Sequence, residues 1–279
     1  MNDDDLVLWD LDDDGVLTLT LNRPERRNSW TPALENRYFA ALDDAAADSG
    51  VRAVVVTGAG ASFCPGVDMQ RLESLADTPL DLADRRPHHH PRGIPKPMIA
   101  AINGGCAGVG LIQALLCDIR FAARGARFAT SFARRGLPAE RGISWLLPRS
   151  IGAENALDLL LSGRTFDADE ALRLGVVSRV EEPAQLLPAA QAYARDLARN
   201  CSPRAMAMIR HQVNADLDSD FGTAFDRSVS AMAEFAGQED FREGVASFVE
   251  RRAPAFAPLP QAPEGAAPSA APQTGGTPA

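Results

Sequence analysis

The sequence predicts an α/β fold, because strand–turn–helix units with Gly-rich turns occur twice and the C-terminal third is mostly helical. In each unit a short run of β-branched or small apolar residues precedes the turn, as in strands that are buried on both faces. The Gly-rich turns lie at residues 58–68 and 104–110, and each leads into a helical segment. We therefore expect a sheet with both faces covered and a helical region appended to it.

The composition agrees with a folded protein and disfavours two classes of partner. The chain has 279 residues, 46% of them hydrophobic and 23% charged, which suits one large core or one core with a small appendage. A net charge of -9 and a pI near 5.0 disfavour nucleic acids and anionic membranes as main partners, since both are polyanions. A local basic pocket for an anionic ligand is still compatible with these values.

The N-terminus and the cysteines predict a cytoplasmic protein. The acidic start MNDDDLVLWDLDDDG lacks the basic and apolar regions of a secretory signal, and no apolar run approaches the length of a membrane span. Four cysteines show neither CxxC spacing nor a His-rich metal pattern, so we expect them to be reduced and mostly buried, with no metal: Cys64, Cys106, Cys117 and Cys201.

The first elements follow from alternation and capping signals. Residues 15–21 (GVLTLTL) alternate and end at a turn-like Asn-Arg-Pro, as a strand does. Thr31 is placed to cap a helix that Pro32 opens and that runs to about Asp48. The run AVVVT at 53–57 then predicts a second, buried strand.

The middle of the chain repeats this pattern. A helix begins at Met69, after the first Gly-rich turn, and residues 77–95 form a loop rich in proline and charge. The run PMIAAIN at 97–103 predicts another buried strand, and an apolar helix at 111–117 follows the second turn.

The remaining chain is mostly helical and ends in a tail. A strand at 119–122 and a hairpin-like piece at 127–130 precede five predicted helices, at 153–161, 168–173, 186–200, 204–213 and 223–234. From Ala253 onward Ala, Pro, Gly and Gln dominate, and such a segment buries too little apolar surface to become ordered. We expect three regions: a core at 1–200, a helical region at 201–252 and a disordered tail at 253–279.

Both Gly-rich turns could bind an anion, because the first amides of a helix are free and its dipole favours negative charge. The alternative is that the glycines only allow tight turns. The residues themselves leave both interpretations open.

Three motifs, NRPERRNSW, VVVTGAGASFCPGVD and AAINGGCAGVGLIQALLCDIRFA, together resemble the enoyl-CoA hydratase/isomerase (crotonase) family. They occur in the family's order, and the resemblance extends from about Val7 to Arg252, through GISWLLPRSIG and EALRLGVVSRV. It implies a spiral of ββα repeats and a C-terminal helical region that builds a homotrimer or homohexamer.

The resemblance also implies a site for a coenzyme A thioester, which is the substrate and not a separate cofactor. An oxyanion hole would consist of the backbone N–H of Val67, which follows Gly66, and that of Val109, between Gly108 and Gly110. Cys64, Gly66, Asp68 and Met69 would line the pantetheine and adenine, with Arg26 and Arg27 near the phosphates.

The sequence departs from the family's hydratases at both of their catalytic glutamates. Those positions match Ile112 and Phe132, neither of which can transfer a proton. Glu140, in GLPAERG, matches the acid of the family's Δ3,Δ2-enoyl-CoA isomerases, which need one carboxylate. The sequence therefore favours such an isomerase, with Glu140 as the proton shuttle. The alternatives are a hydratase that uses Glu140 alone and a non-catalytic acyl-CoA-binding protein.

Several of these residues have structural alternatives. Arg26 and Arg27 equally suit a solvated loop, Asp68 suits a helix cap, and Glu140 suits an ion pair with Arg141 that would weaken it as a base. Other residues are expected to be structural, namely the His88–His90 run as a solvated or lid-like loop, Asp118, Trp30, Trp145 and Phe166.

Overall fold

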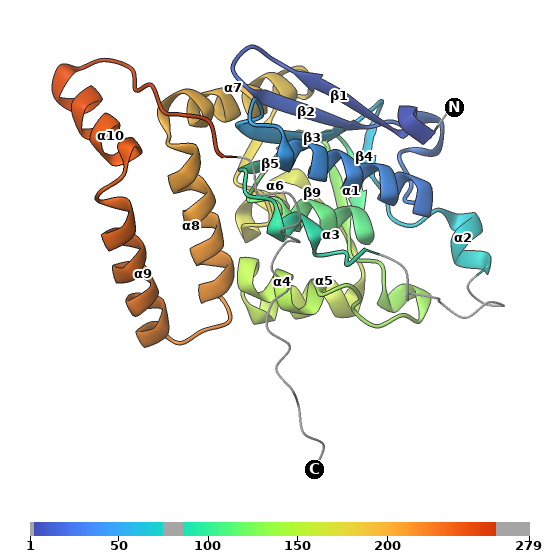
Figure 1. Ribbon diagram of the computed structural model, residues 1–279. Helices are drawn as coiled ribbons and strands as arrows, with labels where there is room; N and C mark the ends of the chain where they lie inside the picture. Colours follow the sequence, from blue (N-terminus) through green and yellow to red (C-terminus); the bar gives the residue numbers. More distant parts are fainter. Residues whose placement is uncertain (1–2, 75–85, 261–279) are drawn as a thin grey trace.

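The computed structural model describes residues 3–74 and 86–260, and a six-stranded sheet forms its centre (Figure 1). The strands lie in the order β1-β2-β3-β5-β7-β10. Only β1 and β2 pair antiparallel, whereas the other neighbours are parallel. The strands are β1 (Val7–Leu11), β2 (Val16–Leu21), β3 (Ala53–Gly58), β5 (Met98–Ile102), β7 (Ile119–Ala123) and β10 (Arg179–Glu181).

A second sheet of four short strands shows how the chain repeats. Its order is β4 (Ser62–Cys64), β6 (Gly105–Ala107), β8 (Arg127–Ala129) and β9 (Thr165–Asp167). Three successive units each give one strand to each sheet and then form a helix. They end in α2 (Met69–Ser74), α3 (Val109–Leu116) and α4 (Ile143–Ile151). The predicted spiral of ββα repeats is confirmed. The hairpin expected at 127–130 is wrong, because β8 pairs with β6 and β9 and not with its neighbour β7.

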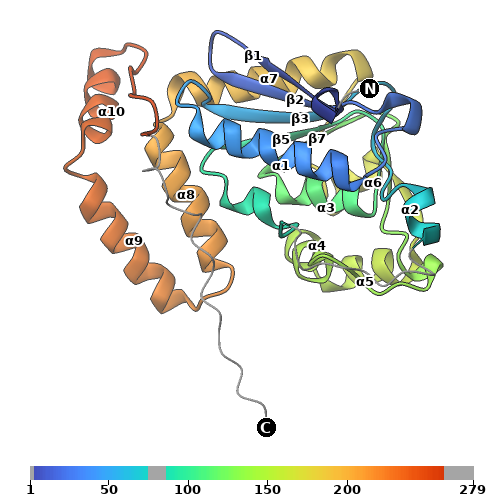
Figure 2. The ribbon, with the colours of Figure 1, turned by 45° about the vertical axis from the view of Figure 1, so that its right-hand side comes forward.

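Helices cover both faces of the larger sheet (Figure 2). In β3, Val54 and Val56 join the core on one side and Val55 joins the core on the other, as the alternation of a strand requires. The first side is closed by α1 (Pro32–Ala47) and α3, the second by α7 (Pro183–Asn200). As predicted, the Thr31 side chain caps α1, accepting a hydrogen bond of 3.2 Å from the Leu34 N–H.

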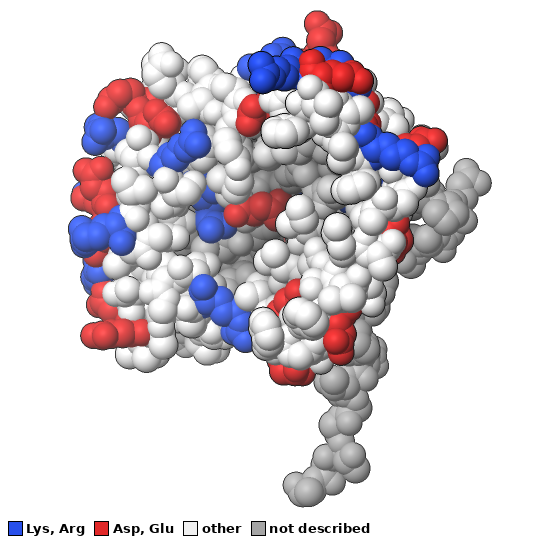
Figure 3. Space-filling model, turned by 90° about the vertical axis from the view of Figure 1, so that its left-hand side faces the viewer, with Lys and Arg blue, Asp and Glu red and all other residues white. Residues whose placement is uncertain are grey.

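Three C-terminal helices form an arm beside the sheets (Figure 1). They are α8 (Pro203–Asp216), α9 (Phe221–Phe235) and α10 (Glu239–Glu250), and they follow α5 (Ala153–Ser162), α6 (Ala168–Leu174) and α7. Figure 3 views the molecule from the side of the arm and shows broad uncharged surface. Large apolar side chains are exposed on all three helices of the arm and at the residue directly after α8: Ile209, Val213, Leu217, Phe221, Phe225, Val229, Met232, Phe241, Val245, Phe248 and Val249.

Hydrogen bonds join the helices of the arm to one another and connect its C-terminal end to the larger sheet. At its start, the Ser202 hydroxyl donates to the Asp240 carboxylate, which joins the first turns of α8 and α10. At its end, the Arg52 guanidinium donates to the carbonyl of Phe256 at 3.0 Å and to that of Ala198 at 3.2 Å. Residues 253–260 have no regular secondary structure, and the rest of the predicted tail lies outside the described residues.

The sequence did not predict every element. It missed the antiparallel strand β1, the helix α10 and the three-residue strands β4, β6, β9 and β10. It also placed the start of the helical region after Arg149, although α4 begins at Ile143. The predicted loop at 77–95 lies partly outside the described residues, and its described end contains the 3-10 turn η3 (His90–Gly93). Among the helices of residues 3–74 and 86–260, none combines the length and apolarity needed to cross a membrane.

Candidate active site

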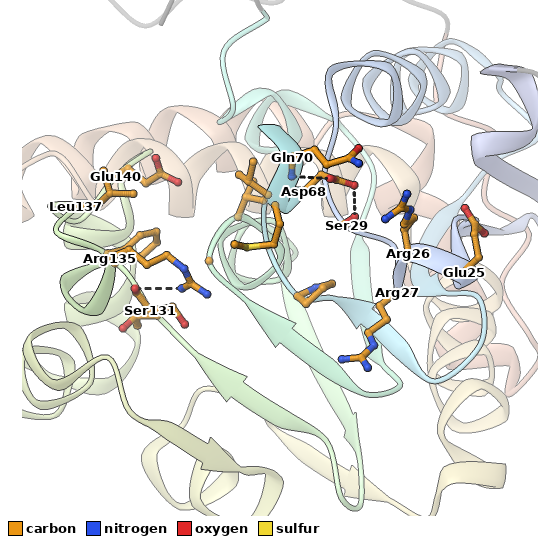
Figure 4. Close-up of a pocket in the computed structure, with 18 residues that line it drawn as sticks. Glu25, Arg26, Arg27, Ser29, Asp68, Gln70, Ser131, Arg135, Leu137 and Glu140 are labelled. Carbon is orange, nitrogen blue, oxygen red and sulfur yellow. Dashed lines mark hydrogen bonds between the residues drawn. The ribbon is translucent and has the colours of Figure 1, made fainter. Parts of the chain in front are cut away.

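A cavity of about 420 Å³ lies where the two Gly-rich turns meet (Figure 4). Its walls come from the 3-10 turn η2 (Pro24–Arg26), both Gly-rich turns and the segment 130–140. Nine predicted site residues line it: Arg26, Arg27, Gly66, Val67, Asp68, Met69, Gly108, Val109 and Glu140. Segments that are far apart in sequence therefore converge on one cavity.

The tenth predicted residue, Cys64, lies outside the cavity lining. It ends β4, is completely buried, and directs its thiol toward the Gly66 carbonyl at 3.9 Å. Burial raises the pKa of this thiol to about 12, and the hydrogen bond to Gly66 offsets the shift only in part. Cys64 therefore packs beneath the turn, and the expectation that it lines the ligand finds no support in the lining of this cavity. None of the four cysteines forms a disulfide, and all but Cys201 are buried, as predicted.

Val67 lines the cavity, and backbone hydrogen bonds of its two neighbours hold the turn on either side of it. The Trp30 N–H donates to the Gly66 carbonyl at 2.8 Å, and the Asp68 N–H donates to the Trp30 carbonyl at 3.0 Å. In such a parallel bridge the residue between the two bonds points its own amide the other way. Within the described residues, the Val67 N–H donates to no backbone carbonyl.

The Val109 N–H is the first amide of α3. The preceding Gly108 adopts φ 52° and ψ -123°, which a side chain would strain, and its N–H donates to the Ala129 carbonyl at 3.1 Å. The first amides of a helix have no partner within that helix, and the helix dipole adds positive potential at this end. In the part of the chain that the structure describes, this amide also has no backbone acceptor.

Close glycine contacts bring the two Gly-rich turns together. A Cβ on Gly108 would lie 3.7 Å from the Gly66 Cα, and one on Gly66 would lie 3.4 Å from the Ala107 carbonyl oxygen. Below them, a Cβ on Gly110 would lie only 2.1 Å from the Cys64 carbonyl oxygen. The turns are thus in direct contact, and two unused N–H donors line one cavity. Chemically, this arrangement suits an oxygen that gains negative charge.

Asp68 is held as a structural carboxylate. It accepts hydrogen bonds from the Ser29 hydroxyl at 2.8 Å and from the Gln70 N–H at 3.2 Å, and Arg23 lies 3.4 Å away. Burial alone would raise its pKa, but these hydrogen bonds and the Arg23 charge outweigh that effect and lower the pKa below its usual value. This geometry agrees with the capping alternative.

Asn28 is an organising residue that the sequence did not single out. Its buried amide donates to the carbonyls of Ala59 at 2.9 Å and Ser62 at 2.7 Å, and its side-chain oxygen accepts from the Arg23 N–H at 2.8 Å. The loop that carries Arg26 and Arg27 is thereby fixed to the first Gly-rich turn. The backbone φ of Asn28 is 61°, a left-handed conformation that the structure shows and the sequence did not indicate.

Glu140 lies on the loop before α4, and its side chain is 34% exposed. The Arg141 Nε is 3.4 Å from its carboxylate, longer than the 2.7–2.9 Å typical of a strong charge-assisted hydrogen bond. Arg141 also lies 3.7 Å from the carboxylate of Glu35, which is buried and accepts a hydrogen bond from the Trp30 indole at 2.8 Å. The foreseen ion pair exists, but Arg141 shares its charge with a second carboxylate.

The positions that match the hydratase glutamates remain apolar in the structure. Ile112 is completely buried and Phe132 is 5% exposed, with Phe132 in the cavity wall. The carboxylates among the described lining residues belong to Glu25, Asp68 and Glu140. Asp68 is held by its hydrogen bonds, and Glu140 belongs to the segment 130–140 that forms another wall of the cavity.

The residues expected to be structural have packing or hydrogen-bonding roles. Trp30 is buried, Phe166 stacks on Phe128 at 5.3 Å, and Trp145 lies beneath the Arg149 guanidinium. Asp118 accepts from the Met98 N–H at 2.7 Å and pairs with Arg210. The expectation of a solvated loop is wrong for two of the three histidines, whose side chains are each 13% exposed: His88 contacts Glu35 and Arg141, and His90 contacts Asp43. No group of three metal-ligating side chains occurs in the described part of the chain.

Comparisons with known proteins agree with this site. The model of a family described as enoyl-CoA hydratase/isomerase matches residues 12–258. A "1,2-epoxyphenylacetyl-CoA isomerase" of Escherichia coli K12 is 34% identical over 250 residues, which cover 87% of this chain and 95% of that protein.

Solved structures are similar as well. One from Mycobacterium abscessus, named a putative enoyl-CoA hydratase/isomerase, has a TM-score of 0.84 at 32% identity, covering 91% of this chain and all of the other. An enoyl-CoA hydratase from Mycobacterium marinum is 51% identical, with a TM-score of 0.66, and covers 75% of this chain and 96% of its own. With a family match over most of its length and relatives of this similarity, the chain belongs to the enoyl-CoA hydratase/isomerase family, the crotonases.

Proposed function

We propose that this enzyme converts 3-enoyl-CoA thioesters to 2-enoyl-CoA thioesters, with Glu140 as the proton shuttle. One observation carries the proposal. The Glu140 carboxylate lines the same cavity as the Val67 and Val109 amides, whereas the positions of the hydratase acids hold Ile112 and Phe132. Isomerisation moves one proton between two carbons and needs one carboxylate, but the family's hydration mechanism uses two.

The lining residues support one orientation of the substrate. The thioester oxygen would accept from the Val67 and Val109 amides, with the pantetheine beside Gly66 and Met69. Arg26 and Arg27 are exposed, and within the described residues neither pairs with an acid. Free guanidinium groups are suited to phosphates, which they bind through paired N–H donors.

The proposed reaction has two proton transfers. Glu140 removes a proton from C2, and the electrons of the C–H bond spread over a dienolate whose oxygen lies in the oxyanion hole. The protonated Glu140 then returns the proton to C4, which leaves the double bond between C2 and C3. Each amide donor contributes roughly 3 kcal/mol to the transition state, and the positioned carboxylate about 10²- to 10⁴-fold in rate.

The test supplies purified protein with 3-enoyl-CoA and 2-enoyl-CoA separately. We expect rapid 3-to-2 conversion, negligible hydration, and a fall in kcat of about 10²- to 10⁴-fold in Glu140→Gln. Glu154→Gln, on the exposed surface of α5, is the matched control and should keep full activity. Full activity in Glu140→Gln would exclude the mechanism.

Hydration with Glu140 as the sole acid is the second candidate, and it is favoured by the hydratase names of several similar proteins. It predicts rapid addition of water to 2-enoyl-CoA and slow isomerisation, the reverse of the first outcome. A non-catalytic acyl-CoA-binding protein would instead bind these thioesters and turn over neither, whatever residue stood at position 140.

A further inference from the structure

The cavity has a third arginine, which the CoA thioester proposed above does not use. Arg135 ends the 3-10 turn η4 (Ala133–Arg135) and lines the wall that also carries Leu137 and Glu140. Arg26 and Arg27 belong to a different segment, around η2. Figure 4 shows Arg135 near Ser131 and Leu137, on the side of the cavity away from Arg26 and Glu25, with its guanidinium directed inward.

Arg135 has unused hydrogen-bonding capacity. Within residues 3–74 and 86–260, its one hydrogen bond runs from Nη1 to the Ser131 carbonyl at 3.3 Å, and no acidic side chain lies within ion-pairing distance. The neighbouring Arg134 differs, because its Nε donates to the Ser162 carbonyl at 2.8 Å and its side chain packs against Gly163. Two adjacent arginines thus have separate roles, one in packing and one at the cavity.

A wholly apolar acyl group would be a poor fit to this wall. Any part of such a group that covered the exposed guanidinium would displace water without replacing the lost hydrogen bonds, which is unfavourable. Arginine presents paired N–H donors that match a carboxylate, and such pairs are among the strongest hydrogen bonds in proteins. Leu137 is 42% exposed beside it and offers apolar surface for the methylenes of a chain.

We propose that Arg135 is a specificity-determining residue that binds a carboxylate on the acyl chain, so that the preferred substrates are enoyl-CoA thioesters whose acyl group carries its own carboxylate. This inference rests on the proposed function for the position of the thioester. It assigns Arg135 to the acyl group, whereas Arg26 and Arg27 serve the phosphates.

The test compares thioester pairs of equal chain length, one ending in a methyl group and the other in a carboxylate. In a series of 3-enoyl-CoA chains, we expect wild-type kcat/KM to favour the carboxylate-ended member by about 10- to 100-fold at the best length. Arg135→Gln should bring this ratio close to one, and Arg135→Lys should keep part of it. Arg134→Gln should keep the full wild-type ratio, because that side chain lies outside the cavity lining.

A binding experiment keeps this proposal separate from the proposed reaction. Calorimetry with saturated acyl-CoA thioesters, ending in methyl or carboxylate, needs no turnover and should show the same preference and the same loss in Arg135→Gln. If the binding preference is present but no thioester is isomerised, the proposed function fails and the Arg135 assignment stands.

Two results would overturn the assignment. One is a wild-type protein that binds and converts both members of every pair equally. The other is an Arg135→Gln variant that weakens both members and free CoA by the same factor, which would make Arg135 a phosphate ligand. Because Arg135 is exposed, circular dichroism and thermal unfolding of the variant should match the wild type, so a loss of preference reports on binding and not on folding.

Discussion

At the residue scale, Asp68 is a carboxylate that the fold uses to hold two loops together. Its partners come from the loop around Ser29 and from the first turn of α2. Its side chain is 11% exposed, and its pKa is lowered because hydrogen bonds from Ser29 and Gln70, together with Arg23, outweigh the effect of burial. A lowered pKa in the folded state means that the ionised carboxylate stabilises the fold.

Asp68→Asn should therefore lower the free energy of unfolding by roughly 1.5–3 kcal/mol at pH 7, the range for hydrogen bonds to charged groups. The stabilisation is present above the pKa of an unfolded aspartate, about 3.9, and is lost as the pH falls through the lower folded value. Urea unfolding between pH 3 and 7 should show the two proteins converging at the acid end. A constant difference would contradict this account. Asp226→Asn, on the exposed surface of α9, is the control.

Glu35 is a buried carboxylate that lies 3.7 Å from the Arg141 guanidinium and accepts a hydrogen bond from the Trp30 indole. Glu35→Leu would leave the Arg141 guanidinium and the Trp30 indole without this partner, so we expect a loss of roughly 3–5 kcal/mol in the free energy of unfolding. Restoring a polar group with Glu35→Gln should recover part of the loss. Equal stability of the three proteins in chemical denaturation would show that this cluster contributes little.

At the scale of elements, the contact between α3 and β4 sets the spacing of the two turns. A Cβ on Gly110 would meet the Cys64 carbonyl oxygen at 2.1 Å, and backbone cannot yield as a side chain does. Gly110→Ala should separate the turns, cost about 1–3 kcal/mol of stability and reduce kcat/KM by about 10²-fold or more, as when an oxyanion donor is lost.

The control for this prediction is Gly237→Ala, because nothing lies within 4 Å of the Cβ that it adds. Thermal unfolding and kinetics of both variants test the pair. Retention of full activity by Gly110→Ala would show that the turn spacing tolerates this shift.

Local signals account for the elements that the sequence predicted. Long apolar runs marked β3 and β5, and Thr31 with Pro32 marked the start of α1, because capping and burial act on neighbouring residues. The three-residue strands β4, β6 and β9 are too short to show a period, and only their pairing with one another defines them. α4 begins directly after Gly142 and contains Pro148. Glycine and proline both argue against a helix when only the sequence is read.

The candidate site, like the fold, was predictable from the sequence only in part. The family motifs were sufficient to place Val67, Val109 and Glu140, and the structure brings all three to one cavity. They could not reveal that Cys64 is buried beneath the first Gly-rich turn, since the placement of this residue depends on the packing of α3. Nor could they reveal Glu35, whose contact with Arg141 joins α1 to a loop more than a hundred residues later.

At the scale of the whole molecule, the arm is the region where a single chain leaves many large apolar side chains exposed. Its exposed apolar side chains recur at spacings of about four on each helix, as at Ile209 and Val213 on α8, and Phe221 and Phe248 are each more than 80% exposed. Patches of this kind mark surfaces that associate with other proteins. The arm therefore has a surface suited to association, and the homotrimer or homohexamer stays a prediction.

Sedimentation at micromolar concentration should show a trimer or hexamer of the wild type. Phe225→Glu and Val229→Glu place charges on the exposed face of α9 and should shift the protein toward the monomer. Asp226→Asn lies between them and should keep the assembly. A wild type that sediments as a monomer would remove the case for an assembled form.

Two contacts join the arm to the larger sheet. Within α8, Arg210 pairs with Asp118, the residue before β7, and beyond α10 the carbonyl of Phe256 accepts a hydrogen bond from Arg52, the residue before β3. Both contacts therefore meet the chain where a strand of the larger sheet begins. A neighbour that displaced the arm would transmit force to β3, the strand that leads into the first Gly-rich turn.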